Sequence, residues 1–69
     1  MSNLIRVNGQ EEELAAGTVV ELLRAKGIDP TARFLAVAVN GIVRPRRDWP
    51  TIRIGVGDHV EIVRPMSGG

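Results

Sequence analysis

Two Asn-Gly dipeptides divide this sequence into strand pairs, and they constrain its fold more than any other feature. Asn8-Gly9 follows the short run Leu4–Val7, and Asn40-Gly41 follows the apolar residues 35–39. Asn-Gly between such runs is the preferred dipeptide of the tight two-residue β-hairpin, because both central residues of that turn adopt positive φ. The sequence therefore predicts two hairpins, the first of which joins residues 4–7 to residues 10–14.

The second hairpin begins with the most apolar segment of the chain, Leu-Ala-Val-Ala-Val at residues 35–39. A nearly continuous apolar run indicates an interior strand covered on both faces, with Leu and Val on one face and the alanines on the other. Ile42-Val43 continues the hairpin until Pro45, which cannot donate to a ladder. Trp49 is expected to anchor the loop that follows. A last strand, at residues 59–64, is expected to pair beside the first strand.

One helix is predicted between the hairpins, over residues 19–26. Thr18 followed by Glu21 matches a capping box, in which each side chain satisfies a free backbone N–H. Gly27 stands where a left-handed residue ends a helix, and Asp29-Pro30 prevents continuation. So short a helix covers only one face of a sheet. The expected fold is therefore α+β, a mixed four- to five-stranded sheet with one main helix across one face.

Composition excludes several classes of function. The chain has 69 residues, a net charge of +1 and no cysteine, which indicates one domain without disulfides, thiolate metal sites or a cysteine nucleophile. No run approaches the ~20 apolar residues of a membrane span, and the near-neutral charge argues against a general nucleic-acid binder. We expect a cytoplasmic protein with no bound metal, no membrane partner and no nucleic-acid partner.

The candidate chemistry lies at Met66-Ser67-Gly68-Gly69. Two glycines form a thin segment without side chains, which can enter a narrow active site and present the carboxylate of Gly69. The alternative is a frayed terminus of no function. We expect a domain of residues 1–65 and a flexible tail of residues 66–69. Ser67, Thr51 and the single imidazole, His59, have no partner that would make a catalytic set. We therefore expect that the chain is not an enzyme.

Five segments occur in an order that is typical of one family. They are Val39-Asn40-Gly41-Ile42-Val43, Pro45-Arg46 with Trp49, Gly57-Asp58, Val60-Glu61-Ile62-Val63 and Gly68-Gly69. This constellation resembles the ThiS family, the small sulfur carriers of thiamine biosynthesis, and the order of elements resembles the ubiquitin-like β-grasp. The resemblance implies that an E1-like adenylyltransferase uses ATP to adenylate Gly69. It also implies that a persulfide donor converts Gly69 to a thiocarboxylate, and that a thiazole synthase receives the sulfur. The carrier itself would bind no cofactor.

Three alternatives remain open at this point. The chain could carry sulfur for another pathway, such as molybdopterin synthesis, cysteine synthesis or tRNA thiolation. It could be a ubiquitin-like modifier whose Gly69 is joined to a lysine amine. It could also be a β-grasp module that binds RNA or a nucleotide, in which case the two glycines are incidental.

A partner-binding surface is expected on the uncovered face of the sheet. The apolar residues proposed for an exposed patch there are Phe34, Ala36, Ala38 and Val63. Arg46 and Arg64 would add charge that steers the partner toward this patch. The alternative is that these apolar residues complete the core.

Overall fold

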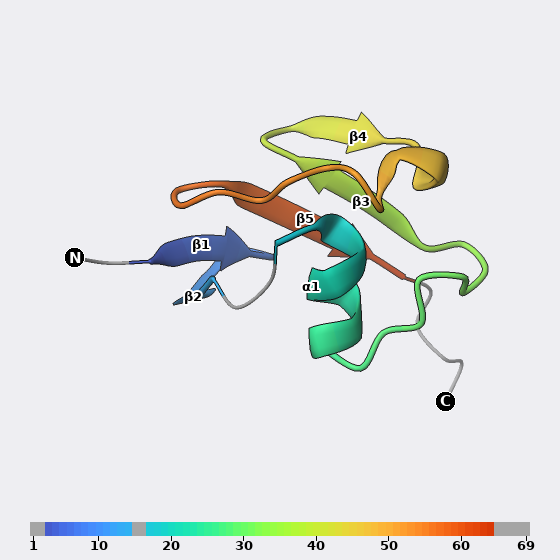
Figure 1. The fold of residues 1–69 in the computed structure, drawn as a ribbon, viewed down its shortest axis with the longest axis horizontal. Helices are drawn as coiled ribbons and strands as arrows, with labels where there is room; N and C mark the ends of the chain where they lie inside the picture. The colour runs from blue at the N-terminus through green and yellow to red at the C-terminus, as the bar shows by residue number, and fades with distance from the viewer. Residues whose placement is uncertain (1–2, 15–16, 65–69) are drawn as a thin grey trace.

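The computed structural model describes residues 3–14 and 17–64. The elements along the chain are β1 (Leu4–Val7), β2 (Gln10–Glu13), α1 (Val19–Ala25), β3 (Ala36–Val39), β4 (Ile42–Arg44), a 3-10 helix η1 (Arg46–Asp48) and β5 (His59–Val63). The five strands form one sheet in the order β2-β1-β5-β3-β4. β5 pairs parallel with β1 and antiparallel with β3, and α1 crosses one face of the sheet (Figure 1). This is the predicted mixed sheet of a ubiquitin-like β-grasp. The proposed tail, residues 66–69, lies outside the described residues.

Both Asn-Gly dipeptides form the predicted turns. Val7 faces Gln10 across the first turn and Val39 faces Ile42 across the second, so each loop has two residues. Both asparagines have φ of 52°, and the glycines that follow have φ of 82°, as this turn requires. The first return strand ends at Glu13, one residue earlier than predicted.

The turn asparagines also complete the ladders of β5. The Asn8 side-chain oxygen accepts a hydrogen bond from the Ile62 N–H at 2.7 Å, and the Asn40 side-chain oxygen accepts one from the His59 N–H at 2.9 Å. In a continuing strand, each of these N–H groups would bond to a backbone carbonyl. The left-handed asparagine supplies an amide carbonyl in its place. Both hairpins are thereby fixed to the central strand.

The helix begins and ends close to the predicted residues. The Thr18 hydroxyl accepts from the Glu21 N–H at 3.2 Å, while the reciprocal bond of a full capping box is not present in the described part of the chain. Gly27 has φ of 74°, and the Ile28 N–H donates to the Leu23 carbonyl at 2.9 Å. This is a Schellman ending, with the left-handed residue at the predicted Gly27. The helix stops at Ala25, one residue before the predicted end.

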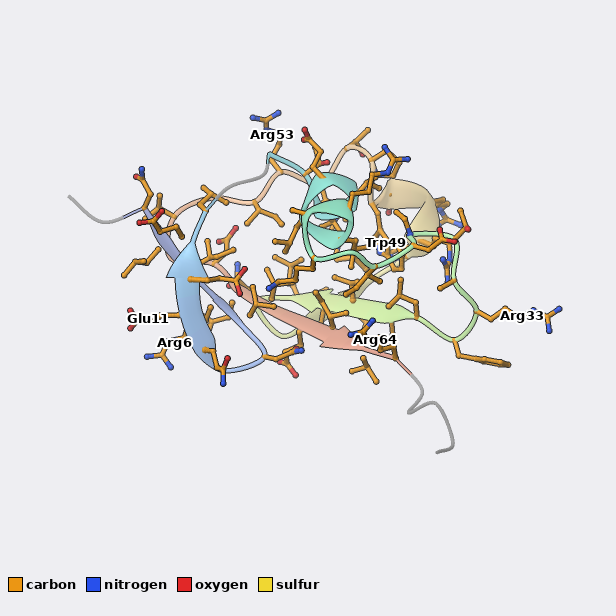
Figure 2. All side chains as sticks on the ribbon, turned by 90° about the horizontal axis from the view of Figure 1, so that it is seen from below. Arg6, Glu11, Arg33, Trp49, Arg53 and Arg64 are labelled. Atoms are coloured by element: carbon orange, nitrogen blue, oxygen red, sulfur yellow. The ribbon has the colours of Figure 1, made fainter. Side chains whose placement is uncertain are left out.

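The core lies between α1 and the sheet. Its buried side chains are Ile5, Val7, Val19, Leu22, Leu23, Ile28, Leu35, Val37, Val39, Trp49, Ile54, Val60 and Ile62. Trp49 is only 1% exposed, and Figure 2 shows it on the side of the sheet that α1 covers. Its Nε1–H donates to the Arg44 carbonyl at 3.0 Å, which satisfies the polar end of the buried ring. The prediction that Trp49 anchors its loop is confirmed.

The expectation that β3 is covered on both faces is wrong. Ala36 is exposed and Ala38 is half-buried, because the single helix covers only the face that carries Val37 and Val39. An alanine leaves little apolar area in water, and exposed apolar atoms are common on protein surfaces. A continuous apolar sequence is therefore compatible with one open face.

Candidate functional site

The open face of the sheet has an apolar half formed by β3, β4 and the end of β5. Ala36 faces Val63 and Ala38 faces Val43, and residues paired in this way share one face of a sheet. Val63 is 61% exposed and Val43 is 71% exposed. The four side chains thus form a contiguous apolar surface, called the open-face patch below.

Sequence reasoning placed three of these four residues in the patch and missed Val43. The missing signal was the register of the hairpin. A two-residue turn at Asn40-Gly41 pairs residue 39 with residue 42 and therefore residue 38 with residue 43. Val43 must then lie on the same face as Ala38.

The other half of the open face is polar. Arg6 pairs with both Glu11 and His59 in the strand register, and a groove of about 480 Å³ follows β5 from Arg6 and His59 to Val63. Arg6 and Glu11 lie 3.6 Å apart with both side chains about half exposed, at the end of the molecule opposite Arg33 (Figure 2). Such an exposed ion pair contributes at most about 1 kcal/mol. His59 is exposed.

Phe34 lies two residues before the first residue of β3 and has an unusual backbone conformation. Its φ is 61°, in the left-handed region that bulky residues rarely occupy. Its side chain is 79% exposed. Because Ala36 faces Val63, the residues just before β3 lie at the end of the sheet where β5 ends.

Arg46 does not lie on the open face with the apolar residues. Its guanidinium donates to the carbonyl of Pro30 and, at 2.7 Å, to the carbonyl of Ala32. It also lies 4.8 Å from the centre of the Trp49 ring, within the range of a cation–π contact. Arg46 therefore fixes the loop that precedes β3, and its steering role stays a prediction.

Arg64 lies on the helix side of the sheet, because it follows Val60 and Ile62 in the strand alternation. It lines a groove of about 520 Å³ together with Asn8, Lys26 and Ile28. The structure thus places the predicted Ala36, Ala38 and Val63 on one face of the sheet and separates both predicted arginines from the open-face patch.

Charge is distributed unevenly between the two ends of the molecule. Residues 30–47 contain four arginines, at positions 33, 44, 46 and 47, and no acidic residue. The consecutive glutamates at 11–13 lie on β2, at the opposite edge of the sheet. Beside the basic segment, the pKa of Asp29 lies below its usual range because its carboxylate accepts bonds from the N–H and hydroxyl of Thr31.

Metal-ligating clusters and membrane-spanning helices are both absent from the described residues. Among them, no three His, Asp or Glu side chains gather to hold a metal ion. No helix in the same part of the chain is long and apolar enough to cross a membrane. The candidate reactive residues, Met66 to Gly69, lie outside the described ranges.

Comparison with known proteins gives a consistent result. The model of the ThiS family matches residues 5–69. A crystal structure of the thiamine biosynthesis protein ThiS from Geobacter metallireducens superposes with a TM-score of 0.78 at 30% identity, covering 96% of this chain and 99% of that chain. A solution structure of a thiamine biosynthesis protein from the same organism gives a TM-score of 0.76 at 30% identity, with coverage of 96% and 87%. No protein with a curated description matches the sequence. The chain therefore belongs to the ThiS family, whose members are small sulfur carrier proteins of thiamine biosynthesis and not catalysts themselves.

Proposed function

We propose that this chain carries sulfur as a thiocarboxylate on Gly69 and delivers it for thiazole formation in thiamine biosynthesis. The observation that supports this most is the family match, which extends through Gly68 and Gly69. The β-grasp body and its similarity to the ThiS structures add support.

The proposed chemistry explains why partners are needed. A terminal carboxylate has a pKa of about 3.3–3.7 and is an anionic, poor electrophile at neutral pH. An E1-like adenylyltransferase would join it to AMP from ATP, with release of pyrophosphate. A persulfide on a donor protein would then attack the carbonyl carbon and displace AMP. A thiol would break the resulting S–S bond, which leaves the thiocarboxylate for a thiazole synthase.

Glycine at the last two positions suits this role. Residues 66–69 span about 13 Å when extended, enough to enter a buried active site while the body stays outside. A Cβ on Gly68 or Gly69 would widen the segment and restrict φ. Met66 and Ser67 would act as spacer or contact positions.

The open-face patch is the proposed docking surface for these partners. Exposed apolar patches on small proteins commonly mark sites of protein association. The patch lies at the end of the sheet where β5 ends, because its residues Ala36 and Val63 face each other. A partner bound there would lie next to the start of residues 65–69.

The test is adenylation and sulfur transfer with purified partner enzymes. Intact mass should show replacement of one oxygen by sulfur, located in the C-terminal peptide, and Gly69→Ala should severely slow adenylation while circular dichroism stays unchanged. Normal activation of Gly69→Ala would refute the proposal. A ladder of heavier conjugates in lysate would instead indicate a protein modifier. Nucleotide or RNA binding that survives removal of Gly68-Gly69 would indicate a binding module.

A further inference from the structure

We propose that Phe34 is the aromatic anchor by which the adenylating partner holds this carrier, and that Arg46 is the residue that positions it. The inference rests on the proposed function and names the part of the carrier body that its partner recognises. The partner surface it requires is an apolar pocket edged by carboxylates.

The first argument is the conformation of Phe34. A residue with a Cβ is strained at a φ of 61°, whereas Gly and Asn adopt this region readily. Strained residues of this kind are concentrated at functional sites. Phe34 as a whole residue is 79% exposed, so packing inside the described part of this chain does not account for its conformation. Both the strained backbone and the exposure indicate that the ring of Phe34 binds a partner outside the chain.

The second argument is the rigidity of the loop that presents the ring. Arg46 donates to the carbonyls of Pro30 and Ala32 on one side of Phe34, and its Nη2 lies 3.5 Å from the Leu35 carbonyl on the other. Arg46 in turn lies against the buried ring of Trp49. An anchor held in one conformation loses less entropy when it binds, which increases affinity.

The third argument is position and charge. Phe34 precedes β3 at the end of the sheet where Ala36 faces Val63 and β5 ends, and the residues that follow β5 are those that the proposed function delivers to the adenylating enzyme. It lies in the segment 30–47, which has four arginines and no acid. Arg33, next to it, extends away from the fold (Figure 2). Aromatic anchors with arginine neighbours are typical of interface hot spots, and this charge favours a partner pocket with an acidic edge.

The test is ATP–pyrophosphate exchange by the adenylating enzyme at varied carrier concentration. Phe34→Asn keeps the left-handed backbone and removes the ring, so we expect KM to rise about 30-fold, the effect of losing a hot spot. We expect kcat to be unchanged and the melting temperature to be equal or higher. The matched control is Val56→Asn, since Val56 is 58% exposed and lies before β5, at its far end. This control should leave KM unchanged, and Phe34→Tyr should restore a KM near that of wild type.

Two arginine variants separate positioning from simple charge. Arg46→Lys keeps the charge but cannot reach several carbonyls at once, so we expect KM to rise about fivefold through a loosened loop. Arg47→Ala removes a neighbouring charge that, within residues 3–14 and 17–64, pairs only with Asp48, at 4.0 Å, and it should change KM less. A larger increase in KM for Arg47→Ala than for Arg46→Lys would show that Arg46 acts by charge alone and would overturn its positioning role.

The outcomes distinguish the two proposals. If wild-type carrier is not adenylated at all, the proposed function fails. If wild type is adenylated and Phe34→Asn has the same KM, the anchor is refuted alone. If wild type elutes as a dimer in gel filtration and Phe34→Asn elutes as a monomer, the ring serves a second copy of this chain and the inference is again refuted.

Discussion

The two Asn-Gly turns allow one substitution to be compared at two positions with different exposure. Asn8→Gly and Asn40→Gly both keep the positive φ of the turn and remove an amide oxygen that accepts from β5; Asn40→Gly also removes the exposed Nδ2–H that donates to Asp58 at 3.1 Å, a bond that water can replace. The Ile62 N–H that loses its partner in the first variant is partly buried. The His59 N–H that loses its partner in the second is exposed, so water can replace the lost acceptor.

The expected loss of stability follows from this difference. Glycine itself costs about 0.5–1 kcal/mol in each variant through unfolded-state entropy. A buried N–H without a partner costs a further ~1–3 kcal/mol, and this applies to Asn8→Gly alone. A domain of this size has a total unfolding free energy of about 3–10 kcal/mol. With a shift of about 4–8 °C per kcal/mol, Asn8→Gly should melt well below Asn40→Gly.

Urea denaturation followed by the fluorescence of Trp49, the one tryptophan of the chain, measures both variants. Amide hydrogen exchange should show lost protection at Ile62 in Asn8→Gly. Asn8→Asp is the control, because it keeps an acceptor and tolerates the left-handed region, and it should stay close to wild type. Equal destabilisation by Asn8→Gly and Asn40→Gly would refute the argument from burial.

Three further predictions concern the body of the domain. Trp49→Phe should lower the unfolding free energy by about 2–4 kcal/mol in urea titrations, because it leaves a cavity and removes the donor to the Arg44 carbonyl; a loss below that of a surface substitution would contradict the assigned core role. Gly27→Ala should cost about 1 kcal/mol in thermal melts, because alanine is strained at a φ of 74°; a higher melting temperature would be inconsistent with the helix ending described here. The bonds from Thr31 hold the pKa of Asp29 below its ordinary value of 3.8. The charged carboxylate therefore stabilises the fold above pH 3.8, and this stabilisation is lost as the pH falls through the folded-state pKa. The melting temperature of Asp29→Asn should therefore lie below that of wild type at neutral pH and converge with it below pH 3.8, and a constant difference would exclude this linkage.

The expected open-face patch shows where sequence reasoning succeeded and where it stopped. The alternation of Ala36 and Ala38 with buried valines correctly separated two faces of β3, because side-chain direction in a strand depends on parity alone. The same reasoning wrongly covered both faces, although the one short helix predicted from the sequence can cover only one face of a sheet. The side chain of Arg64 also obeys the strand alternation and lies on the helix side of the sheet. The prediction nevertheless placed it with Val63, whose side chain lies on the open face.

The sequence by itself determined the local geometry of this protein. The positive φ of Asn8 and Asn40, the start of α1 at Thr18 and its end at Gly27 depend on residues within about four positions of each other. Contacts between distant segments were decided only by the tertiary structure. The Asn8 amide oxygen accepts from the N–H of Ile62, 54 positions later, and the Arg46 guanidinium donates to carbonyls 14–16 positions earlier. Such pairings depend on the order of strands in the sheet, which no local preference encodes. They fix the loop that carries an exposed, strained phenylalanine, because the Arg46 guanidinium bonds to that loop and lies against the buried Trp49 ring.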